Sequence, residues 1–263
     1  MRWKCVIVLM FLLLGITAVP AVAEEITTDN LAKRLENLFQ DRPDIVMEVL
    51  RRNSESVLDI AQQGSNQRHR HSLETQWRAD MKTEKNVRLE GRPVFGSPNA
   101  KVRIVAFSDF TCRFCQQAAI AVNEVMKDYG KDVSLVFKNF PLETKGARAQ
   151  AAAAFLAIAQ QSNEQAWEFH NALFAERDKL IGKGGEAFIF KTAERLGVDV
   201  KKLQKDMKSK KIADMLAEDF ADGKKLGVEG TPFFLVNNLV IRGALPRDLF
   251  RVAVNMEMTE KTK

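Results

Sequence analysis

The sequence predicts an α/β fold preceded by a short helical segment. Three features predict this class: a strand, a helix and a second strand follow one another over residues 101–140, a long helical stretch runs from about 145 to 225, and two short strands and a helix follow at 230–256. Alternating strands and helices are typical of a sheet covered by helices. A chain of 263 residues with 46% hydrophobic side chains can also bury a core without covalent cross-links.

Residues 1–23 are predicted to be a secretory signal peptide. Arg2 and Lys4 precede an apolar run over 6–16, and a small-x-small pattern ends at Ala23. The apolar run is shorter than the roughly 20 residues that span a bilayer, which favours cleavage after Ala23 over an uncleaved membrane anchor. We therefore expect an exported protein that resides in the periplasm.

The formal net charge is +6, and acidic and basic residues are mixed along the chain. A basic balance can accompany nucleic-acid binding, but no basic motif interleaved with aromatic residues is present. The export signal also argues against such a partner. We expect the charges to form a solvated surface, and we expect no nucleic acid among the partners.

Residues 24–90 are predicted to form a helical oligomerisation segment and a linker. Apolar residues recur there at helical spacing, with a polar break at 62–70 and a less regular helical stretch at 73–81. The apolar positions are Leu31, Leu35, Leu38, Val46, Val49, Leu50, Val57, Leu58 and Ala61. An amphipathic face on so short a segment must be buried against something. We expect it to pack on other protomers rather than on the second domain, giving a homodimer or homotrimer.

Residues 91–263 are predicted to form the α/β domain. VRIVAF, which follows Lys101, predicts a strand, CQQAAIAVNEVMKDYG predicts a helix, and VSLVFKNF at 133–140 predicts a second strand. Residues 145–225 are predicted to be a helical insertion. GTPFFLVNN and LVIRG then predict two strands joined near Asn237 and Asn238, and PRDLFRVAVNM predicts the last helix.

The cysteines limit the possible chemistry. Cys5 leaves with the signal peptide, so Cys112 and Cys115 remain as one closely spaced pair. A structural disulfide is one reading, but a bridge over two residues closes a very small loop and gains little entropic stabilisation. A zinc site needs four ligands and finds no matching second set, and Gln116 removes the haem-attachment motif. A redox-active pair is the reading that the spacing favours.

Cys112 is predicted to be a reactive thiolate. It stands where a strand gives way to a helix, and the unpaired N–H groups of a helix N-terminus favour the thiolate over the thiol. Arg113 adds a cation beside it, and Thr111 is the predicted N-cap. Cys115 follows one helical turn later, where its thiol can resolve a mixed disulfide.

A second motif lies far along the chain, where Thr231 and Pro232 precede a strand. With this motif the chain resembles the DsbA-like branch of the thioredoxin superfamily: FSDFTCRFC is similar to its active-site strand and turn, and GTPFFLVN to its cis-proline loop, over residues 94–256. The resemblance implies a thioredoxin fold with a helical insertion and no cofactor. It also implies a Cys112–Cys115 disulfide, with Cys112 as the attacking and Cys115 as the resolving cysteine. Thr231 and a cis Pro232 would then bind substrate by strand addition.

Two positions depart from the pattern of that branch. Members often carry a buried acid six residues before the first cysteine, and here the position is Ala106. Asp109 is closer in sequence, but alternation along a strand predicts that it points differently. The dipeptide between the cysteines, Arg113 and Phe114, is expected to tune the thiolate and does not fix the redox direction.

The leading segment resembles the N-terminal region of ScsC-type proteins, which are linked to copper-stress tolerance. The resemblance implies a disulfide isomerase that acts on unfolded or misfolded secreted proteins and exchanges electrons with a membrane partner of the DsbB or DsbD type. Three alternatives stay open. They are a monomeric dithiol oxidase or reductase, a protein that binds Cu(I) through its two thiolates, and a holding chaperone.

Other residues have simpler readings. The basic and histidine run Arg68, His69, Arg70 and His71 is predicted to be a solvated linker rather than a metal site. Trp167 is predicted in the core and His170, three residues later, on the surface. Met207 and Met215 are predicted at a helical core or its rim, because methionine is an ordinary filler of gaps.

Overall fold

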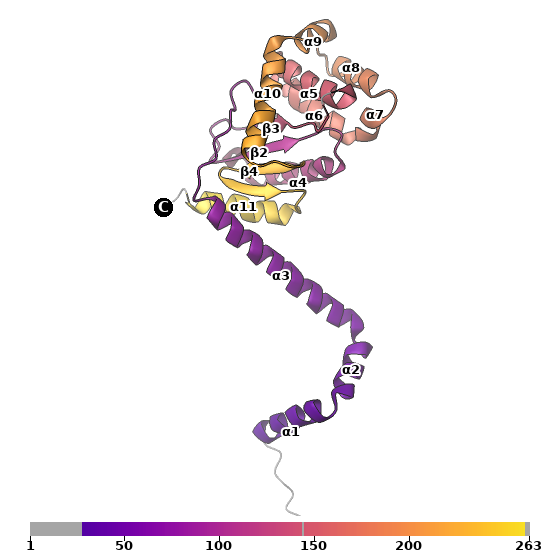
Figure 1. Cartoon of the computed structure of the whole chain (residues 1–263), viewed down its shortest axis with the longest axis vertical. Helices are drawn as coiled ribbons and strands as arrows, with labels where there is room; N and C mark the ends of the chain where they lie inside the picture. Colours follow the sequence, from indigo (N-terminus) through magenta and orange to yellow (C-terminus); the bar gives the residue numbers. More distant parts are fainter. Residues whose placement is uncertain (1–27, 144, 261–263) are drawn as a thin grey trace, which may run out of the picture. The chain divides into compact units, whose positions relative to one another are not determined.

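A computed structural model of the chain describes residues 28–143 and 145–260. The chain divides into two compact units, Met1–Gly64 and Ser65–Lys263. Figure 1 follows the elements from the first helix to the last in sequence colours. The predicted signal peptide, residues 1–23, lies outside the described residues. Within the described ranges no helix is both long enough and apolar enough to cross a lipid bilayer.

The first unit is helical, as predicted. It contains α1 (Thr28–Asp41), α2 (Pro43–Arg52) and the first part of α3 (Ser54–Asp80). Pro43 begins α2, a position where its missing N–H has no helical partner to lose. Every residue from 30 to 64 is exposed or partly exposed. The part of the unit that the structure describes therefore has no core of its own, which agrees with the expectation for helices this short.

The expected break at 62–70 is wrong, because α3 continues through it from Ser54 to Asp80. The stretch lacks apolar periodicity, yet Gln and Arg are good helix formers, and a single interior glycine, here Gly64, costs only about 1 kcal/mol. The polar stretch at 62–70 is thus a solvated part of α3 and does not interrupt the helix. His69 and His71 are exposed residues of this helix rather than of a linker.

The boundary between the units also differs from the one expected near residue 90. The division falls inside α3, and the end of that helix packs in the second unit. Trp77 is fully buried there, and its indole Nε1 donates to the carbonyl oxygen of Val240 at 2.9 Å. Asp80 Oδ2 accepts from the Val240 N–H at 3.3 Å. Residues of α3 therefore occupy both backbone groups of Val240 in the edge strand β5 (Leu239–Arg242), and groups of this kind on an exposed edge can pair with another chain.

The second unit is built on one five-stranded sheet with the strand order β1-β3-β2-β4-β5. β2 and β3 are parallel, and the other neighbours are antiparallel. The four predicted strands are present, and β1 is an additional short edge strand. The bounds are β1 (Val94–Gly96), β2 (Val102–Ser108), β3 (Val133–Asn139), β4 (Phe233–Val236) and β5 (Leu239–Arg242).

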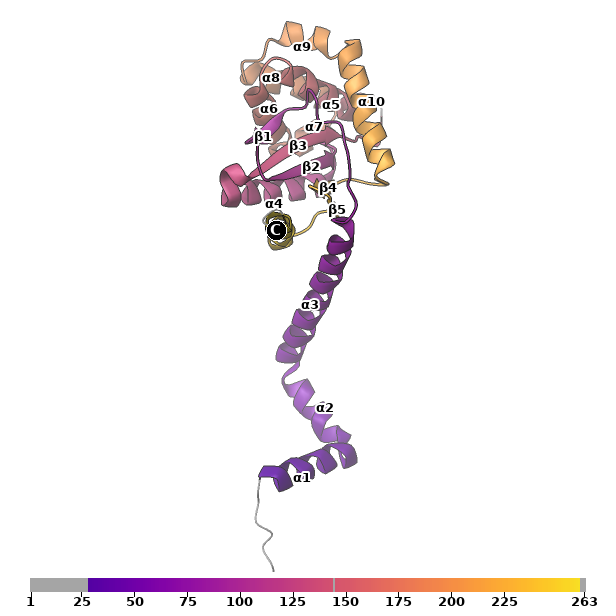
Figure 2. The same ribbon diagram turned by 90° about the vertical axis from the view of Figure 1, so that its left-hand side faces the viewer.

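Helices cover the sheet. α4 (Arg113–Tyr129) and a short 3₁₀ turn, η1 (Gly130–Asp132), connect β2 to β3, and α4 lies beside α11 (Arg247–Glu260) under the strands in both views (Figures 1 and 2). The predicted insertion is entirely helical. It comprises α5 (Gly146–Ala159), α6 (Asn163–Ala175), α7 (Arg177–Ile181), α8 (Gly185–Arg195), α9 (Val200–Asp206) and α10 (Lys210–Lys225).

Side chains alternate between two buried faces along the strands. Ile104 and Ala106 of β2 face the larger core, which α4, α11 and the insertion complete, whereas Val105 and Phe107 face a smaller one. The segment before β1 and the loop after α10 cover that smaller face. Both faces of β2 are buried, so the sequence is apolar almost throughout instead of alternating with polar residues.

A buried ion cluster ties the segment before β1 to β3 and α10. Lys138 Nζ lies 2.9 Å from Asp219 Oδ1 and 2.8 Å from Asp222 Oδ2, and it donates to the carbonyl oxygen of Arg88 at 2.7 Å. Arg92 contacts the same Asp219 oxygen at 3.0 Å. Because Lys138 and Asp219 are fully buried, each depends on the other for compensation of its charge.

Candidate active site

The cysteine pair stands at the end of β2, where the chain turns into α4. The Cys112 N–H donates to the Asp109 carbonyl oxygen at 3.0 Å and closes this turn. The Thr111 N–H and hydroxyl both donate to Asp109 Oδ1 at 2.8 Å. Thr111 was the predicted N-cap of α4, but the structure places Cys112 at that position. The Thr111 hydroxyl is bonded to Asp109 in this turn, so it does not cap the helix. The sulfur of Cys112 takes that position at the helix N-terminus.

The sulfur of Cys112 caps α4. Its Sγ accepts from the Cys115 N–H at 3.4 Å, and the residue is partly exposed. The pKa of Cys112 is lowered to about 5, mainly by the hydrogen bond from the Cys115 thiol and against the opposing effect of burial, with further help from the N–H groups of Cys115 and Phe114. The lowered pKa makes Cys112 a thiolate at neutral pH, and thiolates are the nucleophiles of disulfide exchange.

Cys115 has the opposite character. It is 1% exposed, and burial is the main cause that raises its pKa, so it stays a protonated thiol. Ser108 at the end of β2 is also buried and is a hydrogen-bonding neighbour of this thiol. Cys112 and Cys115 are not joined to each other, so the structure describes the reduced pair, and the Cys112–Cys115 disulfide remains a prediction.

The Thr231–Pro232 loop lies against the pair. The Thr231–Pro232 peptide bond is cis, as expected. β4 begins with Phe233, which pairs with Phe107 of β2, and this register brings the loop beside the end of β2. Cys112 Sγ lies 3.4 Å from the Thr231 carbonyl oxygen. The Pro232 carbonyl oxygen is occupied by the Gly243 N–H at 2.9 Å. Two sequence motifs separated by more than a hundred residues thus meet at one sulfur atom.

The two residues between the cysteines face outward. Arg113 and Phe114 are both exposed, and Phe114 has 60% of its surface accessible. The largest causes of the low Cys112 pKa are hydrogen bonds, to which Phe114 contributes its backbone N–H. The tuning roles assigned to the two side chains from the sequence remain predictions.

No acid occupies the position expected from related chains. Ala106 is 5% exposed in β2 and presents only a methyl group. Asp109 has its carboxylate engaged elsewhere, with Oδ1 bonded to Thr111 and Oδ2 3.2 Å from Arg148 Nε. The expectation that Asp109 points away from the resolving thiol agrees with these contacts.

The helical insertion holds the active-site turn through residues that the sequence did not single out. Arg177 Nε donates to the Thr111 carbonyl oxygen at 2.9 Å, and Gln116 donates to the Phe174 carbonyl oxygen. Arg148 contributes its contact with Asp109. These partners lie more than 30 residues away from the turn, and arginines of this kind are common on helices, so the sequence offers no signal for them.

His170 was expected on the surface, but it is 3% exposed. Its ring packs among Phe110, Phe137, Phe155, Trp167 and Phe174 at centroid distances of 4.9–6.1 Å. Burial lowers its pKa to about 4, so the imidazole is neutral at physiological pH. Trp167 is buried as expected, and Met215 and Met207 are buried and half-buried residues of the insertion, as predicted.

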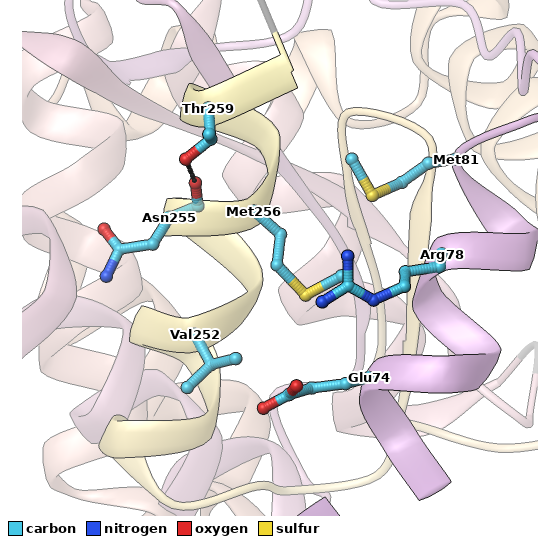
Figure 3. A pocket seen from close by; sticks show the side chains of 7 residues that line it. All are labelled: Glu74, Arg78, Met81, Val252, Asn255, Met256 and Thr259. Carbon is cyan, nitrogen blue, oxygen red and sulfur yellow. Dashed lines mark hydrogen bonds between the residues drawn. The ribbon is translucent and has the colours of Figure 1, made fainter. Parts of the chain in front are cut away.

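Within the described ranges, no group of three or more His, Cys, Asp or Glu side chains is placed to hold a metal ion. A cleft of about 360 Å³ opens between the end of α3 and α11 (Figure 3). Glu74 and Arg78 of α3 and Asn255 and Thr259 of α11 line its sides, and neither cysteine reaches it.

Comparison with known proteins agrees with the fold. The model of the Thioredoxin family matches residues 88–255. A probable disulfide bond formation protein D from Bacillus anthracis is 32% identical over 149 residues, which are 54% of this chain and 68% of that protein. The Na(+)/H(+) antiporter NhaA 3 from Salinispora tropica is 34% identical over 146 residues, which are 55% of this chain but only 21% of the antiporter. The chain thus spans about a fifth to a quarter of the length of the antiporter relatives.

Solved structures share the architecture. A thioredoxin-like oxidoreductase from Silicibacter pomeroyi DSS-3 is 30% identical and aligns with a TM-score of 0.58 over 65% of this chain and 94% of its own. Proteus mirabilis ScsC in a compact conformation is 19% identical and aligns with a TM-score of 0.59 over 85% of this chain and 100% of its own. A periplasmic thioredoxin-like protein from Salmonella enterica serovar Typhimurium is 21% identical, with a TM-score of 0.57 over 64% of this chain and 91% of its own. With the family model covering most of the second unit, the chain belongs to the thioredoxin family and has the DsbA-like form of its fold, with a helical insertion between β3 and β4.

Proposed function

We propose that the chain is a thiol-disulfide oxidoreductase whose reacting groups are Cys112 and Cys115. One observation carries this proposal: a partly exposed thiolate with a pKa of about 5 caps a helix, and a buried thiol stands one turn behind it. The first group is suited to attack and the second to resolution. The relative named as a disulfide bond formation protein supports the same chemistry.

The exchange proceeds in two displacements. The Cys112 thiolate attacks one sulfur of a substrate disulfide, forms a Cys112–substrate bond and releases the other substrate sulfur as a thiolate. Cys115 then attacks Cys112 Sγ, which closes the Cys112–Cys115 disulfide, reduces the substrate and gives up the Cys115 proton. The reverse sequence oxidises a substrate dithiol. The low Cys112 pKa favours this reverse direction, because it stabilises the thiolate of the reduced form.

The cis-proline loop is the proposed substrate contact. The Thr231 carbonyl oxygen, which precedes the cis bond to Pro232, lies 3.4 Å from the Cys112 sulfur, so an extended peptide bound to this loop would pass beside the sulfur. A substrate strand that paired with this loop would place its disulfide beside Cys112. Backbone pairing gives little sequence selectivity, which suits an enzyme that acts on many unfolded or misfolded secreted proteins.

The finer proposal is a disulfide isomerase assembled through its N-terminal helices. Leu31, Leu35, Leu38 and Phe39 of α1 and Met47, Val49 and Leu50 of α2 are 40–54% exposed. Since residues 30–64 include no buried apolar side chain, a second copy of the same helices is the proposed cover, in a homodimer or homotrimer. Several active sites in one assembly would raise the local concentration of thiols around a misfolded substrate.

We propose the periplasm as the location, on the basis of the charged, apolar and small-residue order of residues 1–23. A redox enzyme there needs a source or sink of electrons. The proposed partner is a membrane protein of the DsbB or DsbD type that exchanges disulfides with the Cys112–Cys115 pair.

Recovery of activity from a scrambled disulfide-bonded protein tests the proposal. The wild-type protein should restore native disulfides catalytically, and Cys112→Ser should abolish this. Cys115→Ser should still attack and should accumulate mixed disulfides with the substrate. A wild-type protein that shows no turnover, but whose reduced form binds Cu(I) through the two thiolates, would instead favour the copper-binding alternative.

A further inference from the structure

A narrow cavity lies beside the buried thiol of Cys115. It has a volume of about 20 Å³, which is room for about one water molecule. Apolar side chains of α4, β3 and β4 form most of its wall, but four polar or sulfur-bearing residues also line it: Ser108, Cys115, Asn123 and His170. A single water needs two to four polar partners to be held in a protein interior, and the side chains that could supply them here are those of Ser108, Cys115, Asn123 and His170.

The cavity follows from the small residue at position 106. Ala106 lines it, and the methyl group leaves the space beside Cys115 open. Ala119 and Asn123, one turn apart on α4, also line the cavity and are partly exposed. The lining of the cavity therefore includes both the buried thiol and partly exposed residues of α4.

Among the described residues that line the cavity beside the thiol, none is an acid that could take its proton. Asp109 is engaged with Thr111 and Arg148, and position 106 carries no carboxylate. Yet Cys115 is buried and protonated, and it must lose this proton when it attacks Cys112. A proton acceptor other than a carboxylate is needed for the second displacement.

We propose that this cavity is a hydration site through which the Cys115 proton leaves, and that Ser108 and His170 position the water. The inference rests on the proposed function and adds positioning residues to its second step. As the bond between Cys115 and Cys112 forms and the bond between Cys112 and the substrate breaks, the proton passes from Cys115 Sγ to the water. It then passes to bulk water beside Asn123, and the departing substrate thiolate takes a proton from solvent.

The geometry of His170 suits this role. Its Nδ1 lies 3.0 Å from Asn171 Oδ1. Because an amide oxygen only accepts, this contact requires the tautomer that carries the ring proton on Nδ1, which leaves Nε2 as the acceptor nitrogen of the ring. The neutral imidazole can thus accept a hydrogen bond from the water through Nε2, while the surrounding aromatic rings fix its orientation.

The two displacements can be timed separately with 5,5'-dithiobis(2-nitrobenzoate). Attack by Cys112 of the reduced protein releases a first coloured thiolate, and resolution by Cys115 releases a second.

Two variants test the cavity. Ala106→Val fills it with apolar atoms, and His170→Phe replaces the polar imidazole by an apolar ring of similar size. Each should leave the first phase unchanged and slow the second by at least about tenfold, as for loss of an assisted proton transfer. Ala106→Asp, which places a carboxylate in the cavity, should give a second phase at least as fast as that of the wild-type protein.

Matched controls separate the proton route from packing. Ala253→Val enlarges a buried alanine of α11, and Thr192→Val removes a buried hydroxyl of α8, and neither residue lines the cavity. Both controls should keep the wild-type second phase. A second phase of wild-type rate in folded Ala106→Val and His170→Phe would overturn the inference, as would equal slowing by the controls. If the wild-type protein releases no second thiolate at all, the proposed function itself fails.

Discussion

Trp77 Nε1 donates to the Val240 carbonyl oxygen at 2.9 Å and fastens the end of α3 to the edge strand of the sheet. The indole is fully buried, so this contact combines a hydrogen bond with a large apolar surface. Trp77→Ala should cost about 3–5 kcal/mol of unfolding free energy. Chemical denaturation followed by circular dichroism measures the loss, and a cost below about 1 kcal/mol would show that α3 is only loosely attached there.

The contact between Trp77 and Val240 predicts how many N-terminal residues can be removed without a loss of stability. A protein that begins at Ser65 keeps Trp77 and Asp80 and should retain the thermal stability of the second unit. A protein that begins at Asn86 exposes β5 and should melt at a lower temperature and aggregate. Differential scanning calorimetry on the two shortened proteins makes the comparison. Equal melting temperatures would contradict the assigned role of α3.

The buried ion cluster predicts a large effect from a single charge. Lys138→Met removes one partner and leaves the Asp219 carboxylate buried with less compensation, so it should cost about 3–5 kcal/mol. The double variant Lys138→Met with Asp219→Leu removes both charges and should be more stable than the sum of the two single variants predicts. Urea unfolding of all four proteins tests this coupling, and simple additivity would refute it.

The exposed apolar face of α1 and α2 predicts self-association. Leu35→Glu with Val49→Glu places charges on that face and should convert the assembly to a monomer, whereas Lys33→Glu on the same helix should not. Light scattering at tens of micromolar gives the masses. The monomer should keep exchange with a small disulfide and lose isomerisation of a scrambled protein. A wild-type protein that is itself monomeric would contradict the isomerase proposal and favour an oxidase or reductase.

The low pKa of Cys112 predicts how the two redox forms differ in stability. The folded pKa of about 5 lies below the ordinary value of about 8.5 for a thiol. The stabilisation that this gives the reduced form is therefore lost progressively as the pH falls from about 8 to 5. Cys115 is a thiol in both folded and unfolded states over this window and adds nothing. As the pH is lowered from about 8 to 5, the melting temperature of the reduced form should fall relative to that of the oxidised form. The melting temperature of the Cys112→Ser variant should show no such fall.

Much of the fold could be predicted from local pattern. The apolar runs of β2 and β3, the turn into α4, the helical insertion and the cis-proline loop each have a signature within a few residues. The position of His170 could have been predicted too. It lies three residues after Trp167 on the same helix face, so a core assignment for Trp167 implies a buried His170.

Other features have no local signature. Lys138 and Asp219 lie 81 positions apart, and Arg177 reaches Thr111 across 66. Such pairs form because the fold brings two elements together, and a sequence of one protein does not show which charged residue will meet which. The continuity of α3 through a polar stretch was missed because periodicity reports which face is buried rather than whether a helix forms.

The pKa of Cys112 tests the central claim most directly. Thiolate absorbance of the reduced protein, referred to the oxidised protein, should rise with a midpoint near pH 5. Cys112→Ser should lose this transition, and Cys115→Ala should shift it upward, because the Cys115 thiol is the main hydrogen-bond donor to the thiolate and alanine has no donor in its place. A midpoint near the free value of about 8.5 in the reduced wild-type protein would contradict the assignment of Cys112 as the attacking thiolate.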